Sequence, residues 1–177
     1  MSAKEFGPIR QVAYLVEDLP ASLGRWSRYA GIGPWTLYRN VELVGQCRGR
    51  DTVVRIDVGL SYQDGLQIEL IQPTSRTASP YQDAGGRILV GMHHIAWMTD
   101  DLARDKALAL ARGLSVAFEA GNAAASVVYL EAPAEPGILY EFIQTSPPLL
   151  QGFAAGAAAA RAWDGRQVVL KTIDFAG

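Results

Sequence analysis

The sequence predicts an α+β fold built from two tandem copies of one strand–helix–three-strand unit. Three observations carry this prediction: strands of alternating apolar and polar residues, two capped amphipathic helices, and a short pattern that occurs twice. We expect a single domain over residues 1–177. Its parts are a first βαβββ unit at 7–73, a linker at 74–90, a second βαβββ unit at 91–146, and an alanine-rich helix–strand extension at 147–177.

The composition is that of an ordinary globular protein, and it disfavours several functional classes. Hydrophobic residues make up 49% and charged residues 19%, and the net charge of −2 does not favour binding to nucleic acid or to an anionic membrane. No stretch resembles a signal peptide or a membrane span. Cys47 is the single cysteine, which rules out an internal disulfide and fits a reducing compartment. We therefore expect a cytoplasmic protein that binds neither nucleic acid nor membrane.

The first unit begins with a strand over residues 10–16 and a helix that Asp18 caps and Gly31 ends. Leu23 and Trp26 lie on the apolar face of that helix. The remaining elements are expected to be a strand at 33–39, a polar loop at 40–51, a strand at 52–62, and a strand at 66–73 that follows an Asp-Gly turn.

The second unit repeats this order, and an extension follows it. We expect a strand at 92–99, a helix that starts near Asp100 or Asp101 and ends at Gly113, and strands at 114–120, 126–132 and 138–145. Beyond them lie an alanine-rich helix at 153–163 and a strand at 166–175. A surface helix with an edge strand is the favoured interpretation of this extension. The alternatives are a flap over the site or an arm that contacts a partner.

The repeat is visible at the first and last strands of each unit. Placing "QVAYLVEDL" over "HIAWMTDDL" aligns Gln11 with His94, and placing "LQIELIQP" over "ILYEFIQT" aligns Glu69 with Glu141. Each unit therefore carries polar side chains at matching positions of its first and last strands.

The only two histidines, His93 and His94, are adjacent, so an unbroken strand would direct them to opposite faces. His94 shares a face with the small Ala96, while Ile95 and Trp97 suit packing on a helix. We therefore expect His94 to face the concave side of the sheet. His93 is expected to face the helix side or the rim.

Glu69 and Glu141 each stand between apolar residues, where a carboxylate is costly to bury without a partner. An edge strand with outward-facing acids would explain either one alone. A metal ion would satisfy both, and the ligand set would then be Gln11, Glu69, His94 and Glu141. Such an oxygen-rich set suits Zn, Mn, Co, Ni or Mg with open positions for water.

The stretches "QVAYLVEDL", "IELIQP", "HHIAWMTDDL" and "YEFIQ" resemble the vicinal oxygen chelate superfamily, with its glyoxalase/bleomycin-resistance/dioxygenase fold, over about residues 7 to 146. The resemblance implies a half-open, cup-shaped mixed β-barrel with flanking helices. It also places the metal ligands at Gln11, Glu69, His94 and Glu141. Gln11 departs from the histidine common in dioxygenases, fosfomycin-resistance enzymes and epimerases.

The glyoxalase I and methylmalonyl-CoA epimerase branches are the most similar, and they share a mechanism. The resemblance implies an isomerase, epimerase or lyase that abstracts a proton from a carbonyl-containing small molecule, of acyl-CoA or 2-oxo type, through a metal-stabilised enolate. Glu141 would be both ligand and general base, and Glu69 the second acid/base. The alternatives are a glyoxalase I-like lactoylglutathione lyase and a non-catalytic, resistance-type binding protein. Many relatives pair across chains, so we expect a homodimer.

Several further residues are candidates for contact with the substrate. Arg55, Asp57 and Ser61 form the polar face of the strand at 52–62 and would line the cup. A solvated Arg55–Asp57 pair is the alternative. Trp35 and Tyr38 could form an apolar wall, although packing in the core is the favoured interpretation.

Overall fold

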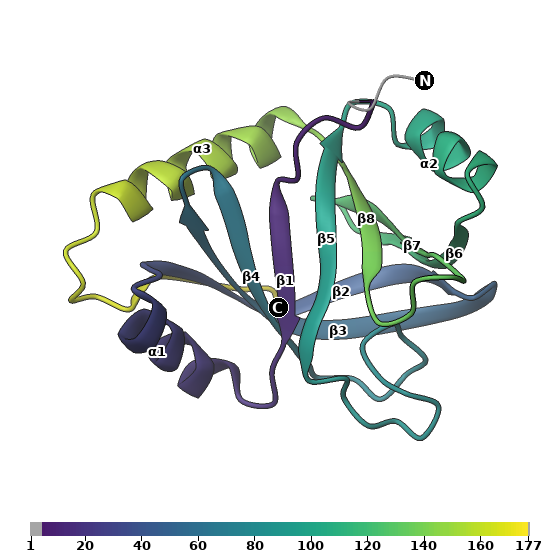
Figure 1. Ribbon diagram of the computed structural model, residues 1–177. Coiled ribbons are helices and arrows are strands. Elements are labelled where there is room, and N and C mark those ends of the chain that lie inside the picture. The colour runs from purple at the N-terminus through teal and green to yellow at the C-terminus, as the bar shows by residue number, and fades with distance from the viewer. Residues whose placement is uncertain (1–4, 177) are drawn as a thin grey trace.

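The computed structural model describes residues 5–176, in which nine strands form one mixed sheet that curls into a barrel with three helices around it (Figure 1). Within these residues no helix is long and apolar enough to cross a membrane. The first unit comprises β1 (Gln11–Leu15), α1 (Leu19–Ala30), β2 (Trp35–Cys47), β3 (Arg50–Gln63) and β4 (Leu66–Pro73). The second comprises β5 (Gly91–Thr99), α2 (Leu102–Ala111), β6 (Ser115–Gly121), β7 (Ser126–Glu131) and β8 (Leu139–Gln144). The extension forms α3 (Pro147–Arg161) and β9 (Val169–Asp174).

The two units meet at their first strands. β1 and β5 pair in antiparallel fashion, and each is flanked in parallel by the last strand of its own unit, β4 or β8. On the far side of the barrel, residues 44–47 of β2 pair with residues 118–121 of β6. Because β2 also pairs with β3, the strands form a closed ring, and β9 is added outside it along β2. The predicted fold class, two βαβββ units in a mixed barrel with a helix–strand extension, is confirmed.

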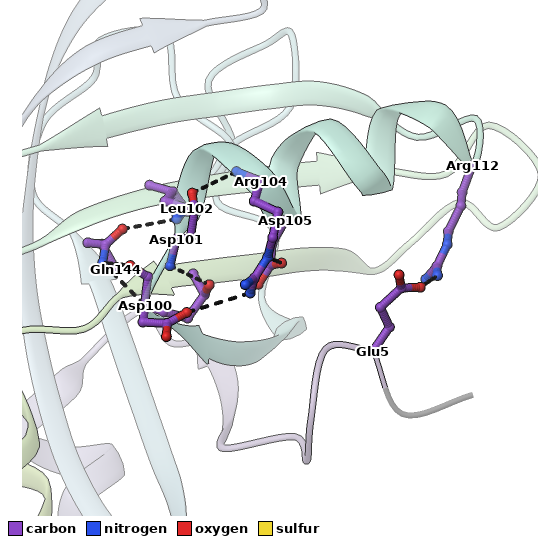
Figure 2. A network of polar contacts seen from close by, with 9 residues as sticks. Glu5, Asp100, Asp101, Leu102, Arg104, Asp105, Arg112 and Gln144 are labelled. Atoms are coloured by element: carbon purple, nitrogen blue, oxygen red, sulfur yellow. Dashed lines mark hydrogen bonds and ion pairs between the residues drawn. The ribbon is translucent and has the colours of Figure 1, made fainter. Parts of the chain in front are cut away.

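Two glutamines at matching places in the units tie each helix to its sheet. The Gln72 side chain accepts a hydrogen bond from the backbone N–H of Leu19 at the start of α1, at 2.8 Å. Gln144 accepts one from Leu102 at the start of α2, at 3.0 Å (Figure 2). The predicted capping residues are also present, Asp18 for α1 and Asp101 for α2. The internal repeat thus extends to the hydrogen bonds that position the helices.

The loop predicted at residues 40–51 is wrong, because β2 continues to Cys47 and turns at Arg48 and Gly49 into β3. Asn40 has a φ of 55°, and the β2–β3 register shifts between Tyr38 and Val41. Such a bulge reverses which residues face the barrel. The alternation of inward and outward side chains is therefore interrupted near Asn40, so the sequence pattern did not predict one continuous strand.

Helix α3 starts at Pro147, earlier than predicted, and Ser146 caps it. It lies across one end of the barrel (Figure 1). Leu149 packs against a cluster formed by Ala96, Val127 and Ile143. Phe153 and Ala157 are buried against Tyr62. The helix is therefore more than a surface element, whereas β9 is the predicted edge strand.

The contact between α3 and the barrel leads to a paired prediction. A Cβ at Gly156 would lie 2.1 Å from a ring carbon of Tyr62, whereas one at Gly152, a turn earlier, meets nothing within 4 Å. Gly156→Ala is expected to destabilise the protein by about 1–3 kcal/mol through overpacking. Gly152→Ala is expected to stabilise it by up to about 1 kcal/mol, because alanine favours a helix. Urea unfolding checks both, and equal effects would contradict the packing of α3 described above.

Candidate metal centre

Four polar side chains meet inside the barrel, one from each of the adjacent strands β4, β1, β5 and β8. His94 is fully buried, and its Nε2 atom lies 3.0 Å from Gln11 Oε1, 2.9 Å from Glu141 Oε2 and 3.3 Å from Glu69 Oε2. Gln11 and Glu141 are 4% and 3% exposed, respectively. The structure thus brings together the four residues that the sequence analysis selected.

The four side chains do not satisfy one another. A ring nitrogen directs its single proton or lone pair in one direction, so His94 Nε2 cannot serve three oxygens. Glu141 Oε2 is buried and has no hydrogen-bond partner, although Nε2 lies 2.9 Å away. A buried, unpaired carboxylate oxygen is costly and suggests a group that the protein alone does not supply.

The charges of this cluster shift the pKa values of its members. Burial lowers the pKa of His94, but the nearby carboxylates of Glu141 and Glu69 outweigh it and raise this pKa to about 9. Burial raises the pKa of Glu141, and the neighbouring His94 only partly offsets that increase. A cation at Nε2, whether a proton or a metal ion, is therefore what this arrangement favours.

The orientation of Gln11 is held by a chain of side-chain hydrogen bonds. Gln11 Nε2 donates to Gln67 Oε1 at 2.6 Å, and Gln67 Nε2 donates to the Tyr62 hydroxyl at 2.7 Å. Because its amide nitrogen is used in this way, Gln11 presents its oxygen to His94. Tyr62 in turn packs edge-on against Phe153 of α3. The extension is thus connected to the cluster through the side chains of Tyr62 and Gln67.

His93 does not lie at the rim or on the helix side, and that prediction is wrong. Ala13 pairs with His94, but the next pair is Tyr14 with Met92, so His93 is the extra residue of a bulge. This bulge places both histidines on the barrel side. His93 is 5% exposed, and its Nδ1 atom lies 2.8 Å from Nδ1 of His94.

Two buried tyrosines that the sequence analysis did not select complete the wall around His94. Tyr129 pairs with Glu141 across β7 and β8, and its ring centroid lies 4.9 Å from that of His94. Tyr81 comes from the predicted linker, and its hydroxyl lies 3.2 Å from that of Tyr129. Burial raises the pKa of both, so the two hydroxyls stay protonated. Tyr129 could have been identified by aligning the last two predicted strands of the second unit as an antiparallel pair, because it is the cross-strand neighbour of Glu141.

The polar face of β3 points away from the cluster, opposite to the expected direction. Val54, Ile56 and Val58 pack into the core cluster that contains Tyr81 and Tyr129. On the other face, Arg55 pairs with Glu42 at 2.9 Å. Asp57 accepts a hydrogen bond from the backbone N–H of Asn40 at 2.8 Å, and Ser61 is buried without a hydrogen-bond partner. The structure therefore does not bring Arg55, Asp57 or Ser61 to His94.

The two predicted wall residues behave differently from each other. Trp35 is fully buried in the cluster under α1, and its Nε1 donates to Ser27 Oγ at 3.0 Å. This is the core packing that was the favoured interpretation. Tyr38 packs against the core cluster of the barrel. Its ring stacks on that of Phe175 in the extension, with the two ring centroids 6.4 Å apart.

The donor set fits a divalent metal ion. Within residues 5–176, no group of three or more His, Cys, Asp and Glu side chains is arranged as a ready-made metal site. The oxygens nevertheless stand 2.9–3.3 Å from His94 Nε2. Two ligand atoms that share one small ion at about 2.1 Å are about 3.0–3.4 Å apart. Such an ion would give the buried Glu141 Oε2 atom the partner that it lacks within the protein.

The pKa of His94 predicts how pH affects the metal-free protein. A histidine whose folded pKa is about 9, above its usual 6.5, stabilises the fold fully below pH 6.5, and this contribution is lost as the pH rises through 9. The raised pKa of Glu141 acts in the same direction. We expect a loss on the order of 3 kcal/mol across this window. Urea unfolding with a chelator present measures it, and His94→Gln should flatten the dependence.

Comparison with solved structures shows the same fold at low sequence identity. A hypothetical protein from Bacillus halodurans C-125 matches with a TM-score of 0.54 and 18% identity, over 78% of this chain and 94% of that chain. The methylmalonyl-CoA epimerase from Mycobacterium tuberculosis matches with a TM-score of 0.55 and 16% identity, over 85% and 96%. A variant of the Streptomyces coelicolor methylmalonyl-CoA epimerase, in complex with 2-nitronate-propionyl-CoA, matches with a TM-score of 0.52 and 19% identity, over 79% and 95%.

Sequence comparison identifies the family. No curated protein matches this chain. The family model of the Glyoxalase/Bleomycin resistance protein/Dioxygenase superfamily matches residues 10–129, which includes Gln11, Glu69 and His94 and ends before β8 and α3. The chain therefore belongs to the Glyoxalase/Bleomycin resistance protein/Dioxygenase superfamily, also called the vicinal oxygen chelate superfamily.

Proposed function

We propose that the protein is a metal-dependent isomerase, epimerase or lyase that moves a proton at a carbon atom next to a carbonyl group. The observation that carries the proposal is the meeting of His94 Nε2 with three oxygens from three other strands, one of which has no hydrogen-bond partner. A protein that only binds a small molecule has no need of four such groups at one point.

Gln11, Glu69, His94 and Glu141 would hold the metal ion. Zn, Co, Ni, Mn and Mg are the candidates, because the set has three oxygen donors and one imidazole nitrogen. When bound, such an ion would polarise the substrate carbonyl and make the adjacent C–H more acidic.

The protein groups would then move the proton. Glu141 is the proposed base, which takes the proton from carbon, because burial raises its pKa and makes its carboxylate a stronger base. Glu69 is the proposed second acid/base, which returns a proton to the same carbon. The Glu69 side chain is 14% exposed, against 4% for Glu141, so it can exchange protons with solvent more readily.

The proposed substrates are small acyl-CoA or 2-oxo compounds. Support comes from the neighbours of the same fold that are named methylmalonyl-CoA epimerases, one in complex with methylmalonyl-CoA and another with 2-nitronate-propionyl-CoA. Their identity to this chain is 21% or less, so the shared fold supports the class of chemistry rather than one substrate.

A non-catalytic binding protein is the second candidate, and the filled barrel favours it. Tyr81 and Tyr129 occupy the space beside His94, and Leu149 of α3 packs against Ala96, Val127 and Ile143. Two surface hollows, of about 590 and 560 Å³, lie elsewhere and include none of the four donors.

Two measurements test the proposal. Purified protein should contain a divalent metal, and adding Zn, Co, Ni, Mn or Mg to stripped protein should raise its Tm. The loaded enzyme should then incorporate solvent deuterium into a member of a panel of acyl-CoA and 2-oxo compounds, with methylmalonyl-CoA tested first. Metal binding without exchange on this panel, together with turnover of a glutathione hemithioacetal, would favour the lactoylglutathione lyase alternative. No metal and no exchange would favour the binding protein.

A further inference from the structure

The contact between the two histidines specifies where their protons lie. Three groups form a chain: the backbone carbonyl of Pro80, the His93 ring and the His94 ring. His93 Nε2 lies 2.9 Å from the oxygen of Pro80, and the two Nδ1 atoms lie 2.8 Å apart. A distance of 2.8 Å between two nitrogens requires one proton between them, carried by one ring and accepted by the other.

The carbonyl of Pro80 decides which ring carries that proton. A carbonyl oxygen can only accept, so His93 Nε2 must donate to it. His93 is 5% exposed and lies against the rings of Tyr81 and Tyr129, and among residues 5–176 it forms no ion pair with a carboxylate, unlike His94. A positive charge is costly in such surroundings, so His93 is neutral. Its Nδ1 atom therefore has a lone pair, and the proton in the contact belongs to Nδ1 of His94.

The other end of the His94 ring is then available to a cation. Its Nε2 atom faces the oxygens of Gln11, Glu69 and Glu141, and the Gln11 amide nitrogen is already bonded to Gln67. All three groups present acceptors to Nε2. With Nδ1 protonated, Nε2 either carries an extra proton or directs its lone pair at a metal ion.

We propose that His93 is a positioning residue that accepts the Nδ1 proton of His94 and so keeps Nε2 of His94 directed at Gln11, Glu69 and Glu141. The carbonyl of Pro80 orients His93, so the segment at residues 74–90 forms part of the centre rather than a plain linker. The consequence for metal affinity rests on the proposed function. The position of the proton does not, because it follows from the hydrogen bonds alone.

Nitrogen-15 NMR of protein labelled at histidine tests the proton positions directly. In both chelator-treated and zinc-loaded protein, His93 should be neutral with its proton on Nε2, and Nδ1 of His94 should be protonated. Zinc should change the signal of His94 Nε2 only. A proton on Nδ1 of His93, or an unprotonated Nδ1 on His94, would overturn the proposal whether or not the protein binds metal.

A pair of variants tests the effect on metal affinity, measured by zinc competition with a chelator. His93→Leu removes the acceptor and should weaken zinc binding by about 10–100-fold, the range for the outer partners of metal ligands. His93→Asn keeps an oxygen near the position of Nδ1 and should bind within about threefold of the original protein. Equal affinities of the folded Leu variant and the original protein would overturn the role of His93. If the original protein binds no zinc, the metal-dependent function fails, and the NMR result alone decides the proton positions.

Discussion

Replacing Glu141 by glutamine is expected to lower kcat by about 10²–10⁴-fold, the range that general acid–base catalysis contributes. The variant keeps the size of the side chain and one oxygen that can bind a metal, but it loses the basic carboxylate. Glu141 is 3% exposed and lies 2.9 Å from His94, and Glu69 is the only other carboxylate that pairs with His94 among residues 5–176. The rate is measured as deuterium incorporation into whichever substrate the exchange panel identifies.

A surface variant and a metal analysis show whether the loss is due to the missing base. Glu42→Gln removes a carboxylate from the outer face, where Glu42 pairs with Arg55, and should leave the rate within about twofold. The metal content of the Glu141→Gln variant should stay close to that of the original protein. A lost rate together with lost metal would make Glu141 a ligand only. An unchanged rate would remove it from the mechanism.

Replacing His94 by alanine is expected to weaken divalent metal binding by more than about 100-fold. Removal of an outer partner already costs about 10–100-fold, and His94 supplies the only nitrogen in the set. Its Nε2 atom lies within 3.3 Å of both Glu69 and Glu141, so the variant leaves two carboxylates without a positive partner. Isothermal titration with Zn or Ni measures the affinity.

The same variant should also destabilise the metal-free protein by about 3–5 kcal/mol at neutral pH, as expected when one partner of a buried charged group is removed. His94→Gln keeps most of the volume and a donor, and it serves as the folded control if the alanine variant does not fold. Metal affinity equal to that of the original protein in the folded alanine variant would exclude His94 as a ligand, whereas the glutamine variant reports on stability only, because its amide oxygen can itself bind a metal.

The meeting of four polar side chains could be predicted from the sequence because it depends on matching positions in a repeat. Gln11 and His94 stand at the same place in their units, as do Glu69 and Glu141, and strand β1 pairs with both β4 and β5. First and last strands that are neighbours in a sheet bring matching positions together. The sequence could therefore select these four residues without any knowledge of distances.

The position of His93 could not be predicted, because it depends on pairing between units. A bulge adds one residue to one strand, and only the register against β1 reveals it. The pattern of alternating side chains, which can be read from the sequence, holds only for an unbroken ladder. The same limit applies near Asn40. There the register between β2 and β3 shifts, and the structure has a continuous strand where the sequence predicted a loop.

The sequence by itself determined the order of elements, the helix caps and the four side chains that meet in the barrel, because these follow from local periodicity and from repetition along the chain. Only the tertiary structure decided which face of each strand lies inside the barrel. Alternation separates the two faces of β3, but closure of the ring determines that Val54 faces inward and Arg55 outward. Closure also brings Tyr129 beside His94 and α3 over the barrel end. These contacts join residues that are distant in sequence, so no local sequence pattern predicts them.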